Sequence, residues 1–479
     1  MWLKKKEKLF NLEKEKEFNK KTDLILTKKE RDEKNKKFEE ELHENWQLYK
    51  LSKLFLILVY LDEFIIKLES AYEDLEGIEG DELSNFLKKR FFKLQEYLPS
   101  SLMGNLFGIK ARDNKDILLY KQYAFGRSIM TDLPYLRINE KGEGLGPHVV
   151  LFSGSSYVKG SLEYHVNVDV KYIIEASKKI RNYIENTKFK EIKSNFRISG
   201  SPLEIKNELL RKMTIEVGDY IIKELEEKEG KILIVVNSYE QTKIVAQNLK
   251  DYFLVKKIKE KIYRLISNSD IIDNDTNETI TRGEISNFLN YDGRVLIAPA
   301  ISIERGHNIT DAQGHSLLSS VFFFIRPLGI PDDLENKITT LNGYISQEIE
   351  KFKNENLFEK NKKIRLEAIK FWYEMNKKVR LDNLENETLK MNIIATMFVL
   401  ILQIFGRLCR VTDLKKESPT VYFVDGAFRK KDDDVGLDTL NEFYNYLSKN
   451  LSDSKEGKIF KTLYEPFFNA YKEGIEYER

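Results

Sequence analysis

The stretch KILIVVNSYEQTKIVAQNL, residues 231–249, decides the fold class of this chain. Residues 232–236 form an unbroken run of Ile, Leu and Val that has the length of a strand. The segment after the turn at 238–239 has the apolar spacing of a helix. A strand that is apolar on both faces is typical of a parallel sheet that helices cover on both sides.

Four more apolar runs of this kind follow along the chain. They are 261–267 (KIYRLIS), 294–300 (RVLIAPA), 317–327 (LLSSVFFFIRP) and 420–426 (TVYFVDG). Helical segments separate these runs, and the alternation predicts one α/β domain with a parallel sheet over residues 201–430. A highly charged stretch from about 334 to 390 interrupts the pattern, and we expect it to be a helical insertion.

The segments on either side of this domain have other patterns. Residues 1–145 are predicted to be a helical region, since 27 of the first 50 are charged and 46–100 have apolar positions at helical spacing. Within 146–200, HVVLFSGSS (148–156) predicts a short buried strand followed by a Gly/Ser turn. Residues 431–479 are predicted to form a tail of short helices.

Composition limits the class of protein. The formal net charge of the 479 residues is +2, which neither favours nor excludes a nucleic-acid partner. Cys409 is the only cysteine, so an internal disulfide and a cysteine-based zinc site are excluded. The N-terminus lacks the apolar core of a signal peptide, and the apolar run 393–405 is shorter than the ~20 residues of a membrane-spanning helix. We therefore expect a cytoplasmic protein without membrane contact and without a metal site of its own.

Polar residues enter an apolar helix at VLILQIFGRLCR, residues 399–410. At ~100° per residue, Gln403, Arg407 and Arg410 lie within about 60° of one another, while apolar neighbours face the other way. Because arginine keeps its charge, such a stripe needs an anionic or polar partner. One interpretation is that the arginines cap the negative end of the helix. The other is that they bind an anionic ligand.

The pattern Gln403-x-x-Gly406-Arg407-x-x-Arg410 resembles motif VI of superfamily 2 helicases of the DEAD/DEAH type. Three other segments resemble further motifs of that family, in the family's order. LFSGSS (151–156) is like motif III, KILIVVN (231–237) with its helix is similar to motif IV, and RVLIAPAISIERGHNI (294–309) is similar to motif V. The resemblance covers roughly residues 149–429.

This resemblance implies a fold and a set of roles. Residues 201–430 would be the second RecA-like lobe of an ATP-dependent helicase or translocase, and 146–200 would end the first lobe and link the two. Arg407 and Arg410, positioned by Gln403, would reach the ATP γ-phosphate across the cleft between lobes. An arginine finger of this kind accelerates phosphoryl transfer by ~10³- to 10⁵-fold. ATP and Mg²⁺ are the cofactors that the resemblance implies.

The remaining roles fall on glycines and on loop residues. Gly406 would let the helix approach closely, and Gly306 and Asn308 would link the nucleotide to the bound strand, although the family commonly has Asp where Asn308 stands. The partner would be DNA or RNA. The candidate nucleic-acid-binding residues are Ser155, Ser156, Ser238, Tyr239, Arg305 and His307. For the serines and Tyr239, ordinary turn chemistry is the alternative.

A phosphate-binding loop, G-x-x-x-x-G-K-[ST], does not occur in the sequence. Asp62-Glu63 follows an apolar run and has the form of a Walker B acid pair, but Leu54, Leu58 and Leu61 also fit one face of a helix. We therefore expect a P-loop-bearing first lobe on a partner chain or a missing part, with 1–145 as a remnant of that lobe or an insertion in it. The alternative is a non-hydrolysing nucleic-acid-binding or scaffold subunit.

Two further features bear on the biological setting. The details SGSSYVKGSLEYHV, ERGHNI, IRPLGIPDD and VYFVDGAF look like helicase-like proteins of bacterial mobile-element and defence islands. The lysine-rich segments 1–40 and 350–380 could follow a phosphate backbone. Their interspersed glutamates also fit a plain solvated surface.

Overall fold

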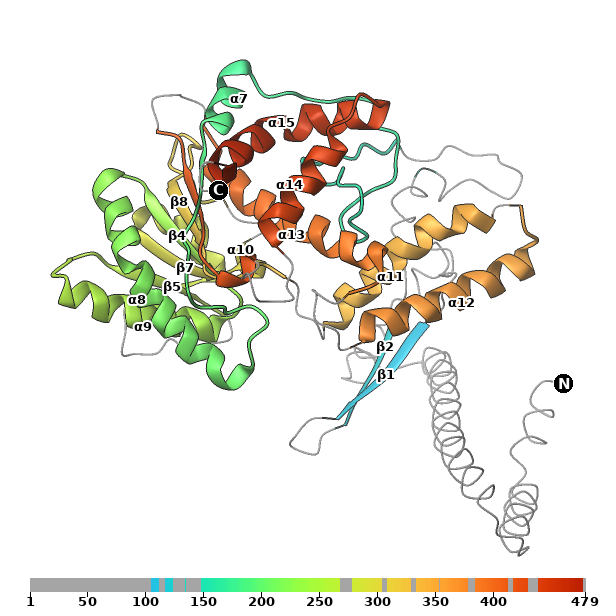
Figure 1. Cartoon of the computed structure of the whole chain (residues 1–479), viewed down its shortest axis with the longest axis horizontal. Coiled ribbons are helices and arrows are strands. Elements are labelled where there is room, and N and C mark those ends of the chain that lie inside the picture. Colours follow the sequence, from blue (N-terminus) through green and yellow to red (C-terminus); the bar gives the residue numbers. More distant parts are fainter. Residues whose placement is uncertain are drawn as a thin grey trace, which may run out of the picture. The chain divides into compact units, whose positions relative to one another are not determined.

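The computed structural model describes most of residues 148–476 (Figure 1). The described ranges are 148–267, 278–303, 308–328, 333–352, 354–377, 384–411, 417–429 and 438–476, together with Pro134 and the backbone of 105–111 and 117–123. The predictions for Asp62, Glu63, Arg305, Gly306 and His307 fall outside these residues. The described residues belong to one compact unit, Tyr97–Arg479.

A seven-stranded parallel sheet forms the centre of this unit. Its strand order is β3-β9-β8-β4-β7-β5-β6, and every pair of neighbours is parallel. The strands are β3 Lys188–Glu191, β4 Lys231–Val236, β5 Ile262–Ile266, β6 Thr279–Thr281, β7 Val295–Pro299, β8 Leu318–Phe323 and β9 Thr420–Phe423. The predicted α/β class is confirmed, and the helix-flanked parallel sheet is consistent with a RecA-like fold. The five strands predicted within 201–430 are β4, β5, β7, β8 and β9.

The two edge strands, β3 and β6, have no counterpart in the predictions. β3 is only four residues long, KFKE, and β6 is only three, TIT. Short polar strands are common at sheet edges, where only one side is paired, so they give a weak sequence signal. Because β3 pairs with β9 through Phe189 and Val421, the predicted boundary at residue 201 lies inside the domain.

Helices cover both faces of the sheet (Figure 1). On one face lie α8 Leu203–Glu227 and α9 Tyr239–Val255. On the other face lie α7 Lys178–Glu185, α13 Glu387–Leu408, α14 Thr439–Asn450 and α15 Lys455–Glu476. Short connecting elements are α10 Ala300–Ile303 and the 3-10 helices η2 Arg282–Asn290 and η5 Gly426–Phe428. This arrangement explains why the central strands are apolar on both sides.

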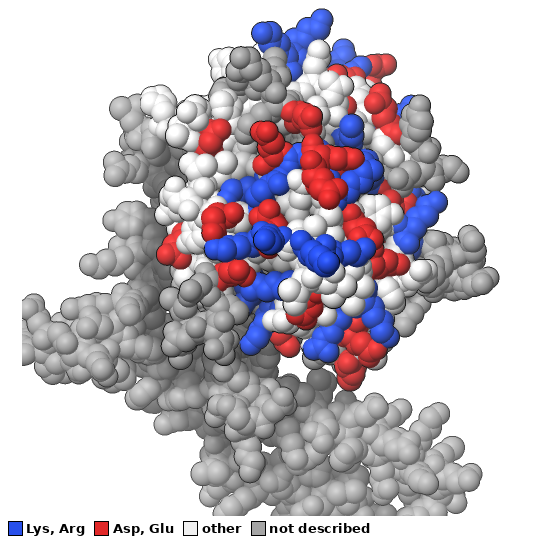
Figure 2. All heavy atoms as spheres, turned by 90° about the vertical axis from the view of Figure 1, so that its left-hand side faces the viewer, with Lys and Arg blue, Asp and Glu red and all other residues white. Residues whose placement is uncertain are grey.

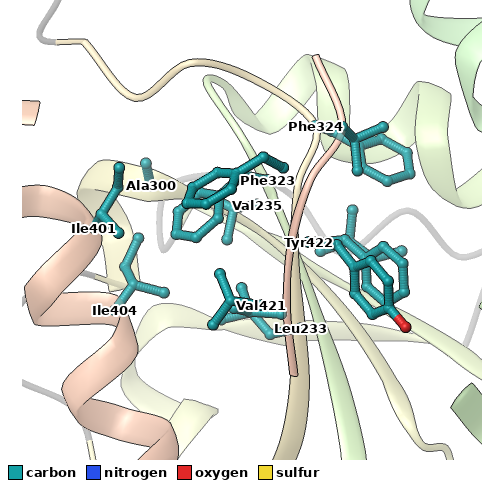
Figure 3. Packing of buried hydrophobic residues seen from close by; sticks show 14 of the residues in the cluster. Leu233, Val235, Ala300, Phe323, Phe324, Ile401, Ile404, Val421 and Tyr422 are labelled. Atoms are coloured by element: carbon teal, nitrogen blue, oxygen red, sulfur yellow. The ribbon is translucent and has the colours of Figure 1, made fainter. Parts of the chain in front are cut away.

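The side chains of the central strands fill two cores, one on each face (Figure 3). Ile401 and Ile404 of α13 meet the side chains on one face, which are Leu233, Val235, Phe323 and Val421. Tyr422 and Phe324 lie on the opposite face. Each fully buried side chain of this size contributes ~1.5–3 kcal/mol relative to an exposed one.

The C-terminal helices are part of this core, and not the tail that the sequence predicts for 431–479. The ring of Phe398 on α13 lies 5.5 Å from the rings of Tyr464 and Phe467 on α15. Phe467 also lies 5.1 Å from Phe189 of β3. The apolar faces of α14 and α15 thus complete the second side of the sheet.

The predicted helical insertion forms a helix pair, α11 Leu334–Glu348 and α12 Leu357–Asn376, joined through the 3-10 helix η3 Ile349–Phe352. It has a small core of its own, in which the rings of Tyr344 and Phe371 stack at 3.9 Å. A Cβ atom at Gly343 would lie 1.8 Å from the carbonyl oxygen of Leu162. Glycine is therefore required where α11 meets the 158–166 segment.

Two predictions of secondary structure are wrong. Residues 148–152 do not form a buried strand, and Val150 and Phe152 are 70% and 81% exposed. An apolar run of this kind predicts a buried strand, but a strand also needs a neighbouring strand to pair with, and residues 148–152 pair with none of the described strands. Within 1–145, predicted as helical, Asn105–Ala111 (β1) and Ile117–Tyr123 (β2) form an antiparallel pair.

Helix α13 is the one helix of the described residues that is long and apolar enough to cross a membrane. The helix has 22 residues, whereas the apolar run 393–405 by itself is too short to cross a membrane. Two thirds of its most apolar window, 67%, is buried within the protein. Packing on the sheet and on α14 and α15 accounts for this apolarity.

Candidate functional site

Helix α13 carries the polar stripe to one end of the sheet. The helix begins at the N-cap Asn386, whose side chain accepts a hydrogen bond from Leu389 N, and it ends at Cys409. Its apolar residues are buried on the sheet, so the stripe of Gln403, Arg407 and Arg410 is fixed in direction by the packing of the whole helix.

Gln403 contacts the turn that resembles motif III. Its Nε2 donates a hydrogen bond of 3.3 Å to Ser155 Oγ, across 248 residues of sequence. The Oε1 atom of Gln403 is buried and has no hydrogen-bond partner among the described residues. Tyr464 OH donates to the carbonyl of Gly154 at 3.5 Å. The turn is therefore held by α13 and α15 of this domain.

Arg410 contacts the loop that resembles motif V. Its Nη1 donates a hydrogen bond to Oδ1 of Asn308. The backbone carbonyl of Arg410 accepts from Ser316 N at 2.6 Å, just before β8. The end of α13 and the loop after β7 are thus joined through both side chain and backbone.

The two arginines differ in exposure. Arg407 is buried, with only 4% of its surface exposed, whereas Arg410 is half-buried and reaches solvent. Of the two guanidinium groups, that of Arg410 is the one that a ligand can approach in this conformation. The helicase resemblance implies equal roles for the two arginines, but they differ in burial.

Gly406 lies between the arginines and is exposed. A Cβ atom there would meet no described atom within 4 Å. The expected close approach of the helix at Gly406 is therefore not found among the described residues. The glycine borders open space instead.

Ser238 and Tyr239 lie at the start of α9, after β4. Ser238 Oγ accepts a hydrogen bond of 3.2 Å from Gln241 N and so caps the helix. Tyr239 OH lies 2.9 Å from Ser302 Oγ on α10. This contact joins the segments that resemble motifs IV and V, and Ser302 is a polar group that the sequence analysis did not single out. Its signal was its position three residues before Arg305.

The predicted residues therefore form two groups. The first, which we call the arginine cluster, consists of Ser155, Asn308, Gln403, Arg407 and Arg410. The second group is the pair Tyr239 and Ser302, with Ser238 beside it as a helix cap. Ser156 follows Ser155 of the arginine cluster in the same turn. Its backbone carbonyl accepts a hydrogen bond of 2.9 Å from Val166 N.

The side chains of the arginine cluster are mainly hydrogen-bond donors. Within the described part of the chain, no group of three His, Cys, Asp or Glu residues could hold a metal ion. Burial raises the pKa of the nearby Cys409 thiol far above its usual range, so no thiolate forms there near neutral pH. Guanidinium, amide and hydroxyl donors remain, and these bind phosphate or carboxylate oxygens.

The surface over α8 and α9 differs from the arginine cluster because it carries charges of both signs. Figure 2 shows Lys and Arg interspersed with Asp and Glu on this face. Several of these charges pair along α8, for example Lys212 with Glu208 at 2.6 Å. Mixed charges of this kind are typical of a solvated surface, and they do not create a field of one sign.

No protein-family model matches the chain, and no curated protein matches it. Fourteen chains of solved structures are similar to it. One is described as an XPD helicase, with 15% sequence identity and a TM-score of 0.30 over 55% of this chain and 34% of that one. The similarity thus spans about a third of that protein's length.

Proposed function

We propose that this chain supplies the second, arginine-bearing RecA-like lobe of an ATP-dependent nucleic-acid helicase or translocase of superfamily 2. The observation that carries the proposal is the position of Arg410. It lies at the solvent-accessible end of a core helix, is half-buried, and is oriented by a hydrogen bond to Asn308. A cytoplasmic setting, as the lone cysteine suggests, fits this function.

Arg410 is the side chain proposed to stabilise the γ-phosphate. Charge that develops on the phosphoryl oxygens in the transition state is stabilised by a guanidinium from the opposing lobe. Arg407, which is buried, would stiffen the end of α13 or contact the nucleotide only after the lobe moves. ATP and Mg²⁺ would be held mainly by a P-loop, which this sequence lacks, so the proposal requires a P-loop-bearing first lobe from another segment or chain.

The hydrogen bonds between motif-like segments suggest how nucleotide and nucleic acid communicate. Arg410 is bonded to Asn308, and Tyr239 lies within hydrogen-bond distance of Ser302 at the start of the same 300–308 segment. A movement of residues 300–308 would therefore change the contacts of both Arg410 and Tyr239. Arg305 and His307 lie inside it and are the proposed contacts to the nucleic acid, and Gly306 is proposed, with Asn308, to link the nucleotide to the bound strand.

The experiment that tests the proposal measures ATP hydrolysis by the purified chain, with and without single- and double-stranded DNA and RNA. The same measurement is repeated after addition of a P-loop-bearing polypeptide encoded beside the gene. We expect turnover only in the mixture, and a fall of ~10³- to 10⁵-fold in Arg410→Ala. Arg181→Ala, which changes a partly exposed arginine on α7 that pairs with Glu175, is the control and should keep full turnover.

A second candidate is a non-hydrolysing nucleic-acid-binding or scaffold subunit. The absent P-loop and the burial of Arg407 favour it. In that case nucleic acid binds, but no combination of partners hydrolyses ATP, and Arg410→Ala changes neither property. Turnover that survives in Arg410→Ala would rule out the arginine role itself.

A further inference from the structure

Helix α12 presents an unusual surface to solvent. Its inner side packs on α11 through Ile364, Ala368 and Phe371, which are all buried. The outer side carries apolar and cationic residues together. These are Phe358, Lys362, Arg365, Leu366, Ile369 and Tyr373, which we call the α12 face.

The α12 face is narrow and free of carboxylates. At ~100° per residue, its six residues fall within an arc of about 100°, and no Asp or Glu of α12 lies in that arc. The aromatic rings at its two ends are strongly exposed, Phe358 by 75% and Tyr373 by 68%. They are 15 residues apart, which is ~22 Å along the helix axis.

The three glutamates of α12 lie outside this arc, with Glu359 just beyond its edge, and two of them pair with other lysines. Glu367 pairs with Lys370 at 2.7 Å, and Glu374 pairs with Lys377 at 2.6 Å. In contrast, Lys362 and Arg365 make no ion pair with any described residue. The two cations of the face are thus available for an anionic partner.

We propose that the α12 face binds single-stranded nucleic acid. Exposed aromatic rings stack on bases without regard to sequence, and cations between them contact the phosphates. The α12 face combines both features along one line. It shares no residue with the arginine cluster, and it depends on the proposed function only in that both involve nucleic acid.

The arrangement of charges favours nucleic acid over a membrane or a partner helix. A membrane-bound helix keeps its cations on a polar side, away from its apolar residues. Here Lys362 lies between Phe358 and Tyr373 in the helical projection, so insertion into lipid would bury its charge. A docked apolar helix would bury it in the same way, at a considerable desolvation cost.

The test is a binding measurement on the full chain without nucleotide. Fluorescence anisotropy of labelled oligo(dT) and oligo(U) gives the Kd at several salt concentrations. Phe358→Ala and Tyr373→Ala should each weaken binding ~5- to 150-fold, as expected for loss of one stacked base. Lys362→Gln with Arg365→Gln should lower the slope of log Kd against log salt by about 1.4, for two lost phosphate contacts.

The control removes two charges from another helix. Lys212→Gln with Lys223→Gln changes two exposed lysines of α8, which are 52% and 65% exposed, and should leave Kd unchanged. Ultraviolet cross-linking should place the oligonucleotide on the peptide that contains Tyr373. All variants change surface residues, so an unchanged Tm confirms that each is folded.

Three results would overturn the proposal. One is an unchanged Kd in the α12 variants. Another is loss of binding to anionic phospholipid vesicles while oligonucleotide affinity stays the same. The third is a change only in self-association, seen by sedimentation. The two proposals can fail separately, since Arg410→Ala should lower ATP turnover in the mixture by ~10³- to 10⁵-fold, whereas Phe358→Ala and Tyr373→Ala should weaken nucleotide-free oligonucleotide binding even if no mixture hydrolyses ATP.

Discussion

The two faces of the sheet both carry polar groups in apolar surroundings, but these groups are arranged differently. On the α8 face, Glu224 accepts hydrogen bonds from Ser320 and, at 2.6 Å, from Tyr422 OH, and Lys228 lies 3.1 Å from its Oε2. On the α13 face, the guanidinium of Arg410 is bonded to Asn308 and still reaches solvent.

Exposure and the number of partners distinguish a structural polar group from a candidate binding group. The Glu224 cluster is closed, because α8, β8 and β9 supply a partner for each of its charges and almost no surface is exposed. The arginine cluster is open at Arg410, which is only half-buried. The closed cluster around Glu224 therefore has a structural role, and the partly exposed Arg410 is, in our proposal, a ligand-binding group.

The largest effect on stability is expected for Glu224→Ala. The substitution leaves Lys228, whose side chain is 10% exposed, without its carboxylate. Removal of one partner from a buried ion pair costs ~3–5 kcal/mol, and urea unfolding measures it. The control Glu208→Ala removes the partner of Lys212 on the same helix, where both side chains are more than half exposed, and should cost at most ~1 kcal/mol. Equal losses in the two variants would show that the cluster is not special.

A smaller effect is expected from acid. Burial by itself raises the pKa of Glu224, but hydrogen bonds from Ser320 and Tyr422 and the charge of Lys228 outweigh it, and the pKa falls below its usual value. The carboxylate thus stabilises the folded state above the unfolded pKa, and this contribution is lost as the pH falls through the folded pKa. The free energy of unfolding should decrease more steeply below about pH 4.5 in the wild type than in Glu224→Gln. Parallel profiles would contradict this.

On the opposite face, the hydrogen bond between Gln403 and Ser155 should contribute about 1 kcal/mol. A double-mutant cycle with Gln403→Met and Ser155→Ala isolates the coupling energy of the pair. We expect ~0.5–1.5 kcal/mol from urea unfolding of the four proteins. Strict additivity would mean that the turn is held by α15 alone, through Tyr464.

The smallest effect is expected for Gly406→Ala, and it has the opposite sign. Alanine is favoured over glycine in a helix by up to ~1 kcal/mol, and a Cβ atom at Gly406 meets no described atom within 4 Å. Thermal unfolding should therefore show a slightly raised Tm. Gly343→Ala is the contrasting control, since its Cβ would lie 1.8 Å from the Leu162 carbonyl oxygen and should lower Tm. A destabilised Gly406→Ala would argue against open space at that position.

Local patterns predicted much of the fold and part of the site. Each of the five central strands is a largely apolar run, and β4 and β7, whose runs are unbroken, could be identified directly from 231–237 and 294–300. The same signal failed at 148–152, because an apolar run needs neighbouring strands and the sequence does not say whether they exist. It also failed at β3 and β6, whose short polar sequences depend on a partner strand for their conformation.

The α/β class and the polar stripe of Gln403, Arg407 and Arg410 could be predicted from local patterns, because strand length and helical periodicity are properties of neighbouring residues. The packing of the folded chain brings Gln403 to Ser155 and Arg410 to Asn308, and it buries Arg407 while Arg410 stays accessible. Such contacts join residues far apart in the chain, and they depend on how whole helices pack on the sheet.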